Sequence, residues 1–316
     1  MNNKFEEYTY DWKTNRNSMN TKAIVVYIDN NETNFEEFSW LYKSWILWDL
    51  YKEYDIVAYT NPKAIEGMYK YVEKHNNLIV RPLTPIYEID SFWEDYKFAN
   101  SFFMFSDNSE SEWIQSNYEY ILKSDADVFL TKNMKGLIPD KTMIGLGGYM
   151  IEGYEDVKKN IERLFLELKI KDKGINHVGA SIFGKSKIVI PIVRDHFNVT
   201  KIILQKEWNN GPGKWPGWFR GVSSMYAIHL VVNHYLNPMN VNMYSIDSLC
   251  LDNKITKTTY HIHAWHVNQD FSKHKWFLGN YTPVKYNSIP EIAKDYCLWI
   301  ASNDINSLKN TPINNV

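Results

Sequence analysis

Apolar runs alternate with stretches of helical periodicity in the first third of the sequence, and this alternation leaves few possible folds. The runs cover residues 23–28, 54–60 and 77–81, and each ends at polar residues or at proline, as strands do. Between the first two runs, apolar residues recur at helical spacing: Phe35, Phe38, Leu41, Tyr42, Trp45 and Trp48. Strands that alternate with helices need crossover connections. The sequence therefore predicts an α/β fold with a Rossmann-like, mostly parallel central sheet flanked by helices.

The second half of the sequence has a looser pattern that mixes further helices and strands. Further helices are expected over residues 64–75, 92–105, 155–168, 195–207 and 222–235, and later strands over residues 142–148, 177–184, 241–250 and 258–265. We therefore expect a polar arm over residues 1–20, a single domain over residues 21–305 with a mixed α+β second half, and a tail over residues 306–316.

One acidic motif closes the fourth strand-like run, within the segment 118–130, and the apolar residues 128–130 follow it directly. Asp125 and Asp127 flank Ala126 there, and this is the single Asp-x-Asp of the chain. Alternate residues of an extended chain point to the same side, so the two carboxylates would lie side by side and repel each other. A divalent metal with oxygen ligands would relieve the repulsion. A solvated turn that merely favours Asp is the alternative interpretation.

Composition excludes several classes of protein. The formal net charge is −2 and no run of Lys or Arg forms a basic stripe, so nucleic acid is not an expected partner. No apolar stretch reaches the length of a transmembrane helix, and the polar residues 1–4 lack the core of a signal peptide. With two cysteines, Cys250 and Cys297, a disulfide framework is not expected. We therefore expect a soluble, cytoplasmic protein.

An Asp-x-Asp at the end of the fourth strand of such an α/β half resembles the GT-A fold of nucleotide-sugar-dependent glycosyltransferases, over about residues 22–280. The resemblance implies that Asp125 and Asp127 bind Mn²⁺ or Mg²⁺, which holds the diphosphate of a UDP-sugar donor. It also implies a nucleotide-binding half over residues 21–135 and an acceptor half over residues 136–305. A fixed cation suits this chemistry because negative charge develops on the departing diphosphate.

A second signal lies downstream, where four of the nine histidines fall between His261 and His274. Residues 260–266, followed by Lys273, Lys275 and Trp276, resemble the late His…Lys-Pro-Trp element of glycogenin-like retaining glycosyltransferases, although Lys-His-Lys-Trp stands here in place of Lys-Pro-Trp. The resemblance implies that His263 or His266 completes the metal shell and that Lys273 and Lys275 lie near the diphosphate. Histidines that alternate along a strand also fit an ordinary hydrogen-bonded face.

The same resemblance indicates where the nucleotide lies. Tyr27 and Asp29, at the end of the first strand, would contact base and ribose, and Ala126 would let the backbone approach the ribose. Lys97 and Asn100 lie on the predicted helix 92–105, from which such enzymes reach the sugar or the phosphates. Tyr27 as a core residue and Lys97 as a solvated helix charge are the alternatives.

The acceptor side is less defined in the sequence. Trp215 and Trp218 lie in a loop rich in Gly and Pro and would need a saccharide, an apolar acceptor or the core to cover them. Asn176 and His177 are candidates to line the pocket that holds the sugar.

No Asp or Glu occurs between Trp208 and Ile246, the interval where an inverting enzyme would carry its base, so we expect retention. Asp247 is then a candidate to stabilise the transition state or contact the sugar. The function predicted is transfer of a sugar to a hydroxyl of a glycan, protein or small molecule. Metal-dependent nucleotidyl or phosphoryl transfer and a non-catalytic carbohydrate-binding protein are the alternatives.

Overall fold

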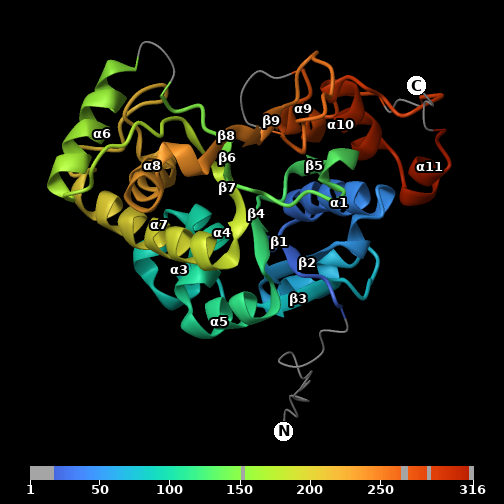
Figure 1. Ribbon diagram of the computed structural model, residues 1–316, viewed down its shortest axis with the longest axis horizontal. Coiled ribbons are helices and arrows are strands. Elements are labelled where there is room, and N and C mark those ends of the chain that lie inside the picture. The colour runs from blue at the N-terminus through green and yellow to red at the C-terminus, as the bar shows by residue number, and fades with distance from the viewer. Residues whose placement is uncertain (1–17, 151–153, 265–269, 283–285, 313–316) are drawn as a thin grey trace, which may run out of the picture.

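A seven-stranded sheet forms the centre of the molecule in the computed structural model, which describes residues 18–150, 154–264, 270–282 and 286–312. The strands lie in the order β3-β2-β1-β4-β7-β6-β8 (Figure 1). Their bounds are β1 (Lys22–Ile28), β2 (Tyr54–Thr60), β3 (Leu78–Pro82), β4 (Tyr120–Lys123), β6 (Thr142–Leu146), β7 (Val178–Lys185) and β8 (Val241–Ile246). Neighbours run parallel except at β7, which is antiparallel to both β4 and β6. The predicted fold class, a mostly parallel sheet flanked by helices, is confirmed.

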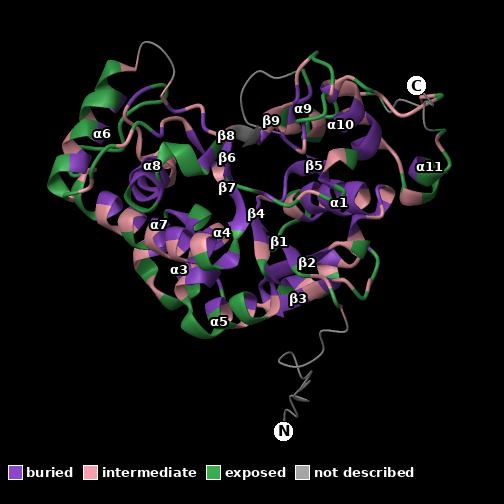
Figure 2. Cartoon of the chain, viewed as in Figure 1, coloured by how far each residue is buried: buried purple, intermediate pink, exposed green. Residues whose placement is uncertain are grey.

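Both faces of the first strand are apolar, and helices cover the sheet on both sides. Every residue of β1 is buried, as expected for a parallel strand between two layers of helices. Ile24, Val26 and Ile28 belong to the core under α1 (Glu32–Leu47). The alternate residues Ala23, Val25 and Tyr27 belong to a second core on the opposite face. Figure 2 shows the result, with buried strands in the middle and exposed faces on the outer helices.

The helices form layers on the two faces of the sheet. Helices α1 and α10 pack on one face, while α4, α7 and α8 contribute to the core of the other (Figure 1). The bounds of the remaining helices are α2 (Ile65–Met68), α3 (Ile86–Ile89), α4 (Asn100–Phe103), α5 (Asn108–Asn117), α6 (Glu155–Glu167), α7 (Ser186–Lys206), α8 (Ser223–Tyr235), α9 (Lys273–Phe277), α10 (Ala293–Ser302) and α11 (Ile305–Lys309). Among the described residues, no helix combines the length and the apolar character needed to cross a membrane.

A small second sheet lies beside the carboxyl end of β4. It contains β5 (Val128–Leu130), β10 (His261–His263) and β9 (Ser248–Leu249), in the order β5-β10-β9. The chain therefore leaves the central sheet after Lys123 and enters the second sheet at Val128. The acidic motif was expected to close the fourth strand, whereas residues 124–127 form a connection between the two sheets and are not part of a strand.

Two predicted helices are also corrected. The helix expected over residues 92–105 is broken into α4 and short 3₁₀ turns. The helix expected over residues 64–75 ends at Met68. Gly67, where a Cβ atom would lie 2.7 Å from the ring of Phe35, is a poor residue for a helix interior.

Candidate metal and nucleotide site

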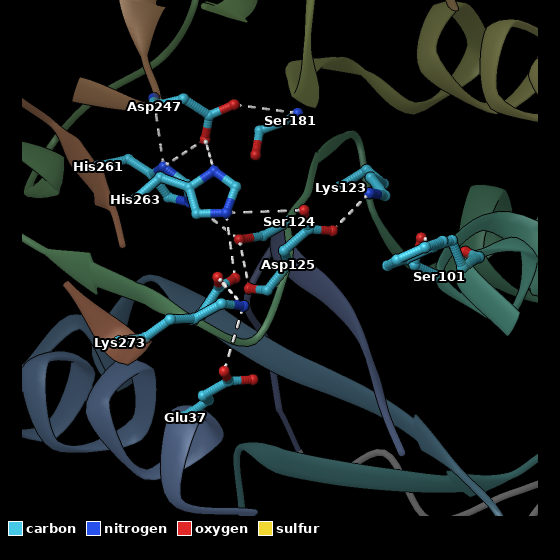
Figure 3. A network of polar contacts seen from close by, with 12 residues as sticks. Glu37, Ser101, Lys123, Ser124, Asp125, Ser181, Asp247, His261, His263 and Lys273 are labelled. Carbon is cyan, nitrogen blue, oxygen red and sulfur yellow. Dashed lines mark hydrogen bonds and ion pairs between the residues drawn. The ribbon is translucent and has the colours of Figure 1, made fainter. Parts of the chain in front are cut away.

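Strand pairing brings the acidic motif and the late histidines together. Strand β10 runs antiparallel to β5, so His263 is paired with Val128, the residue after Asp127. The N–H of Ala264 then donates to the carbonyl of Asp127 at 2.9 Å. One ligand atom from each of Asp125, Asp127 and His263 lies within 4.8 Å of the other two (Figure 3).

The three side chains form a set that fits a divalent cation. His263 Nε2 lies 3.1 Å from Asp127 Oδ1 and 3.8 Å from Asp125 Oδ2. Two carboxylates with one imidazole suit Mn²⁺, which accepts hard oxygen ligands together with nitrogen. The predicted grouping of the two aspartates with His263 is therefore found in the fold.

Two lysines flank this group from opposite sides. Lys273, on α9, places Nζ 2.7 Å from Asp127 Oδ2 and 3.2 Å from Glu37 Oε1 on α1. Lys123, the last residue of β4, places Nζ 2.9 Å from Asp125 Oδ1. With Asp247, four carboxylates and two ammonium groups lie in one network (Figure 3).

The electrostatics of the site follow from this crowding. Burial alone would raise the pKa of Asp127, but the charges of Lys273 and His263 and their hydrogen bonds hold it well below its usual range. Burial likewise opposes protonation of His263, yet Asp127 and Asp247 raise its pKa well above the ordinary value. Burial and the charge of Asp127 raise the pKa of Glu37 to about 7, against the opposing effect of Lys273.

Asp247 lies behind the histidines and not in the open site. Its side chain is 0 % exposed, and its Oδ1 lies 3.0 Å from His261 Nδ1 and 3.4 Å from His263 Nδ1. Burial would raise its pKa, but hydrogen bonding and charge from the two histidines lower it strongly. The residue predicted to contact the sugar therefore faces the histidines.

The residues predicted to hold the nucleotide gather around Asp29, just beyond the carboxyl end of β1. Burial raises the pKa of the Asp29 carboxyl, and the nearby charge of Lys97 and the side chains of Tyr27 and Asn100 oppose that rise. The Asp29 N–H donates to Asn34 Oδ1 at 2.7 Å, and Asn34 Nδ2 donates to Glu37 Oε2 at 2.8 Å. Asn34 thus links this group to the metal cluster.

Ala126 and Lys275 occupy contrasting positions. Ala126 is buried between the two aspartates. Lys275 lies exposed on α9, two residues beyond Lys273. Of the two histidines predicted as metal ligands, His263 lies in the site, and His266 lies outside the described residues.

The predicted acceptor residues come from two segments, one before β7 and one before α8. Asn176 and His177 precede β7, and the carbonyl of His177 accepts from the N–H of Gly147 at 2.7 Å. Trp218 stacks on Tyr226, with ring centroids 4.2 Å apart, and is therefore packed by the protein itself. Trp215 is 40 % exposed. Of the alternatives left open for the two tryptophans, packing by the protein applies to Trp218, whereas Trp215 is exposed.

Sequence reasoning missed Glu37 and Lys123, which lie in the network. Glu37 interrupts the apolar face of α1 close to its amino-terminal end, and that is a signal the sequence offered. Lys123 is the charged last residue of the buried strand β4, two residues before Asp125. A charged residue inside an otherwise apolar run is costly to bury without a partner, and both have one here.

Comparison with solved structures finds glycosyltransferases at low sequence identity. Core-mannan synthase A from Aspergillus fumigatus, in a Mn/GDP form, matches with 9% identity over 73% of this chain and 75% of its own, at a TM-score of 0.41. The galactosyltransferase LgtC, in complex with donor and acceptor sugar analogs, matches with 10% identity over 72% and 75%, at 0.44. Mouse xyloside xylosyltransferase 1 matches with 10% identity over 70% and 84%, at 0.40.

Comparison by sequence gives the family. No curated protein matches the chain. One family model matches residues 16–297, which include every described residue of the candidate site. The chain therefore belongs to the family described as a domain of unknown function, DUF7164.

Proposed function

We propose that this chain is a metal-dependent glycosyltransferase that moves a sugar from a UDP-sugar to a hydroxyl group of an acceptor, with retention of the anomeric configuration. The observation that carries the proposal is the convergence of Asp125, Asp127 and His263 at the carboxyl end of β4, with Lys273 against Asp127. Ligands of open α/β sheets bind beyond the carboxyl ends of the strands.

The charges of the site support a diphosphate leaving group. Asp125, Asp127 and His263 would hold Mn²⁺ or Mg²⁺, which supplies electrostatic stabilisation to a departing nucleoside diphosphate. Lys273 lies beside these ligands at the start of α9 and would share the phosphate charge. Glu37 holds the ammonium group of Lys273 in place from the other side.

The nucleotide would lie over β1. Tyr27 belongs to β1, Asp29 follows its carboxyl end, and Lys97 and Asn100 adjoin Asp29. Polar groups for a base and ribose are thus linked through Asn34 to Glu37 of the metal cluster. Retention is favoured by the lack of Asp and Glu between Trp208 and Ile246, since one-step inversion needs a general base near the acceptor. Trp215 remains the candidate for stacking on an acceptor.

Thermal unfolding with ligands tests the proposal. The full chain is heated with UDP-, GDP- and CMP-sugars, each with and without Mn²⁺, beside Asp127→Asn and the exposed control Asp140→Asn. We expect stabilisation of about 2.7 kcal/mol at a ligand concentration of about 100 Kd. It should require both Mn²⁺ and the UDP-sugar and be lost in Asp127→Asn alone.

Product identification then separates the rival functions. Release of UDP supports sugar transfer, whereas release of pyrophosphate indicates nucleotidyl transfer. Sugar binding without turnover indicates a carbohydrate-binding protein. If no nucleotide stabilises the chain in the presence of Mn²⁺, the proposal is wrong.

A further inference from the structure

A chain of polar contacts connects Ser124 with Asp127 through two histidines and Asp247. Ser124, the residue before Asp125, places Oγ 2.9 Å from Nε2 of His261. His261 Nδ1 lies 3.0 Å from Asp247 Oδ1, and the same oxygen lies 3.4 Å from His263 Nδ1. His263 Nε2 then faces Asp127 Oδ1 at 3.1 Å. Asp247 is therefore connected to both ends of the acidic motif through histidines (Figure 3).

The backbone and the neighbouring strands are adapted to Asp247. Its φ is +59°, a conformation that residues other than Gly seldom adopt. A Cβ atom on Gly145 would lie 1.9 Å from Asp247 Oδ2, so the glycine leaves the space that the carboxylate fills. The N–H of Ser181 donates to Asp247 Oδ2 at 3.2 Å. A left-handed backbone conformation that Asp tolerates, a cleared space and a hydrogen-bond donor together fix this carboxylate in one orientation.

From this geometry we propose that Asp247 is a positioning residue, which orients His263 so that Nε2 binds the metal while Nδ1 keeps its proton toward Asp247. The proposal rests on the proposed function, because it concerns the same metal. Metal-binding histidines commonly donate their second ring N–H to a carboxylate, and that partner fixes both the tautomer and the ring orientation. Asp247 itself, 0 % exposed, does not reach the sugar.

The substitution Asp247→Asn tests this sharply, because Asn has the same shape and tolerates a positive φ. The Ser181 N–H would hold the amide oxygen, as it now holds Oδ2, and the amide NH₂ would then face the histidines. An NH₂ group opposite Nδ1 favours the tautomer with the proton on Nε2, which is the wrong nitrogen for the metal. We expect Mn²⁺ affinity to fall about 10- to 100-fold.

A double-mutant cycle decides whether Asp247 acts through His263. Mn²⁺ affinity is measured by calorimetry for the wild type, Asp247→Asn, His263→Gln and the double variant. If Asp247 acts through the histidine, Asp247→Asn has no further effect once His263 is replaced. An effect of equal size in both backgrounds overturns the proposal. Far-UV circular dichroism and thermal unfolding of the metal-free variants check that each one folds.

Turnover at saturating Mn²⁺ distinguishes a positioning role from direct contact with the sugar. A positioning residue raises the Mn²⁺ concentration needed for activity, and excess Mn²⁺ restores the rate. A residue in contact with the sugar lowers the rate at every Mn²⁺ concentration, and that result would refute the assignment. If the wild type itself binds no divalent cation with UDP, the proposed function fails. If the wild type binds the cation and Asp247→Asn binds it equally well, the positioning role alone fails.

Discussion

Lys273 Nζ lies 2.7 Å from Oδ2 of Asp127, so a lysine of α9 occupies one oxygen of the carboxylate that the proposed metal needs. The other oxygen of Asp127 faces His263. Lysine and metal would thus compete for Asp127 until a diphosphate attracts the ammonium group.

Replacing Lys273 by Met should therefore have opposite effects on two ligands. Mn²⁺ alone should bind about tenfold more tightly, because a competing cation is gone, while UDP in the presence of Mn²⁺ should bind about tenfold more weakly; each tenfold is about 1.4 kcal/mol. Calorimetric titrations measure both. Lys275→Met, on the exposed side of the same helix, is the matched control and should change the UDP affinity little. Equal losses in both variants would contradict the special position of Lys273.

His196 should make the protein less stable in mild acid. Burial lowers the pKa of His196 to about 3, with the charge of Lys123 adding to the effect. Between that value and the ordinary pKa of 6.5, the unfolded state binds a proton that the folded state does not. The contribution of His196 to the free energy of unfolding therefore falls as pH falls, by about 2 kcal/mol between pH 7 and pH 5.

Urea unfolding at several pH values measures this effect. In His196→Gln the dependence on pH should be flatter by about that amount, whereas His234→Gln, at an exposed position on α8, should keep the wild-type slope. An unchanged slope in His196→Gln would mean that the folded state accepts the proton.

Replacing Trp218 by Ala should destabilise the protein much more than replacing Trp215 by Ala. Trp218 stacks on Tyr226 and on Trp208, so Trp218→Ala should cost about 3–5 kcal/mol of unfolding free energy. Trp215 is partly exposed, and Trp215→Ala should change stability by about 0.5 kcal/mol. Denaturant unfolding compares the two. If Trp215→Ala instead raises only the KM for an acceptor, the predicted acceptor contact gains direct support.

Gly145 should be needed for metal binding although it carries no ligand. A methyl group there would lie 1.9 Å from Asp247 Oδ2 and displace the carboxylate. Gly145→Ala should therefore lower both stability and Mn²⁺ affinity. Gly136→Ala is the control: its φ of +67° makes any side chain costly by about 1–2 kcal/mol, but no atom lies within 4 Å of the new Cβ. Its Mn²⁺ affinity should equal that of the wild type.

The sequence was informative where one local pattern determines the structure. The buried runs of β1 and β2 and the helical spacing of α1 depend on side chains a few residues apart, and they were predicted correctly. The sequence also singled out Asp125, Asp127, His263 and Lys273, which lie together in the fold, because a short motif and a late cluster both carry unusual residues.

The features that could not be predicted from the sequence depend on contacts between distant segments. Glu37 enters the site through Lys273, which lies far away in the sequence, and no spacing rule connects α1 with α9. The depth of Asp247 depends on the packing of Gly145 and Ser181 against it. The sequence left open what covers Trp218, because its stacking partner Tyr226 lies on α8. Each of these positions is decided by tertiary packing.

The connection 124–127 joins two sheets, with Asp125 close to the end of β4 and Asp127 directly before β5. A cation that bridges these carboxylates would therefore act as a clamp between the two sheets, besides preparing a phosphate for departure. Amides of β5, β9 and β10 should then exchange with deuterium more slowly when Mn²⁺ is bound. Binding of the cation would therefore make the two sheets around the site more rigid.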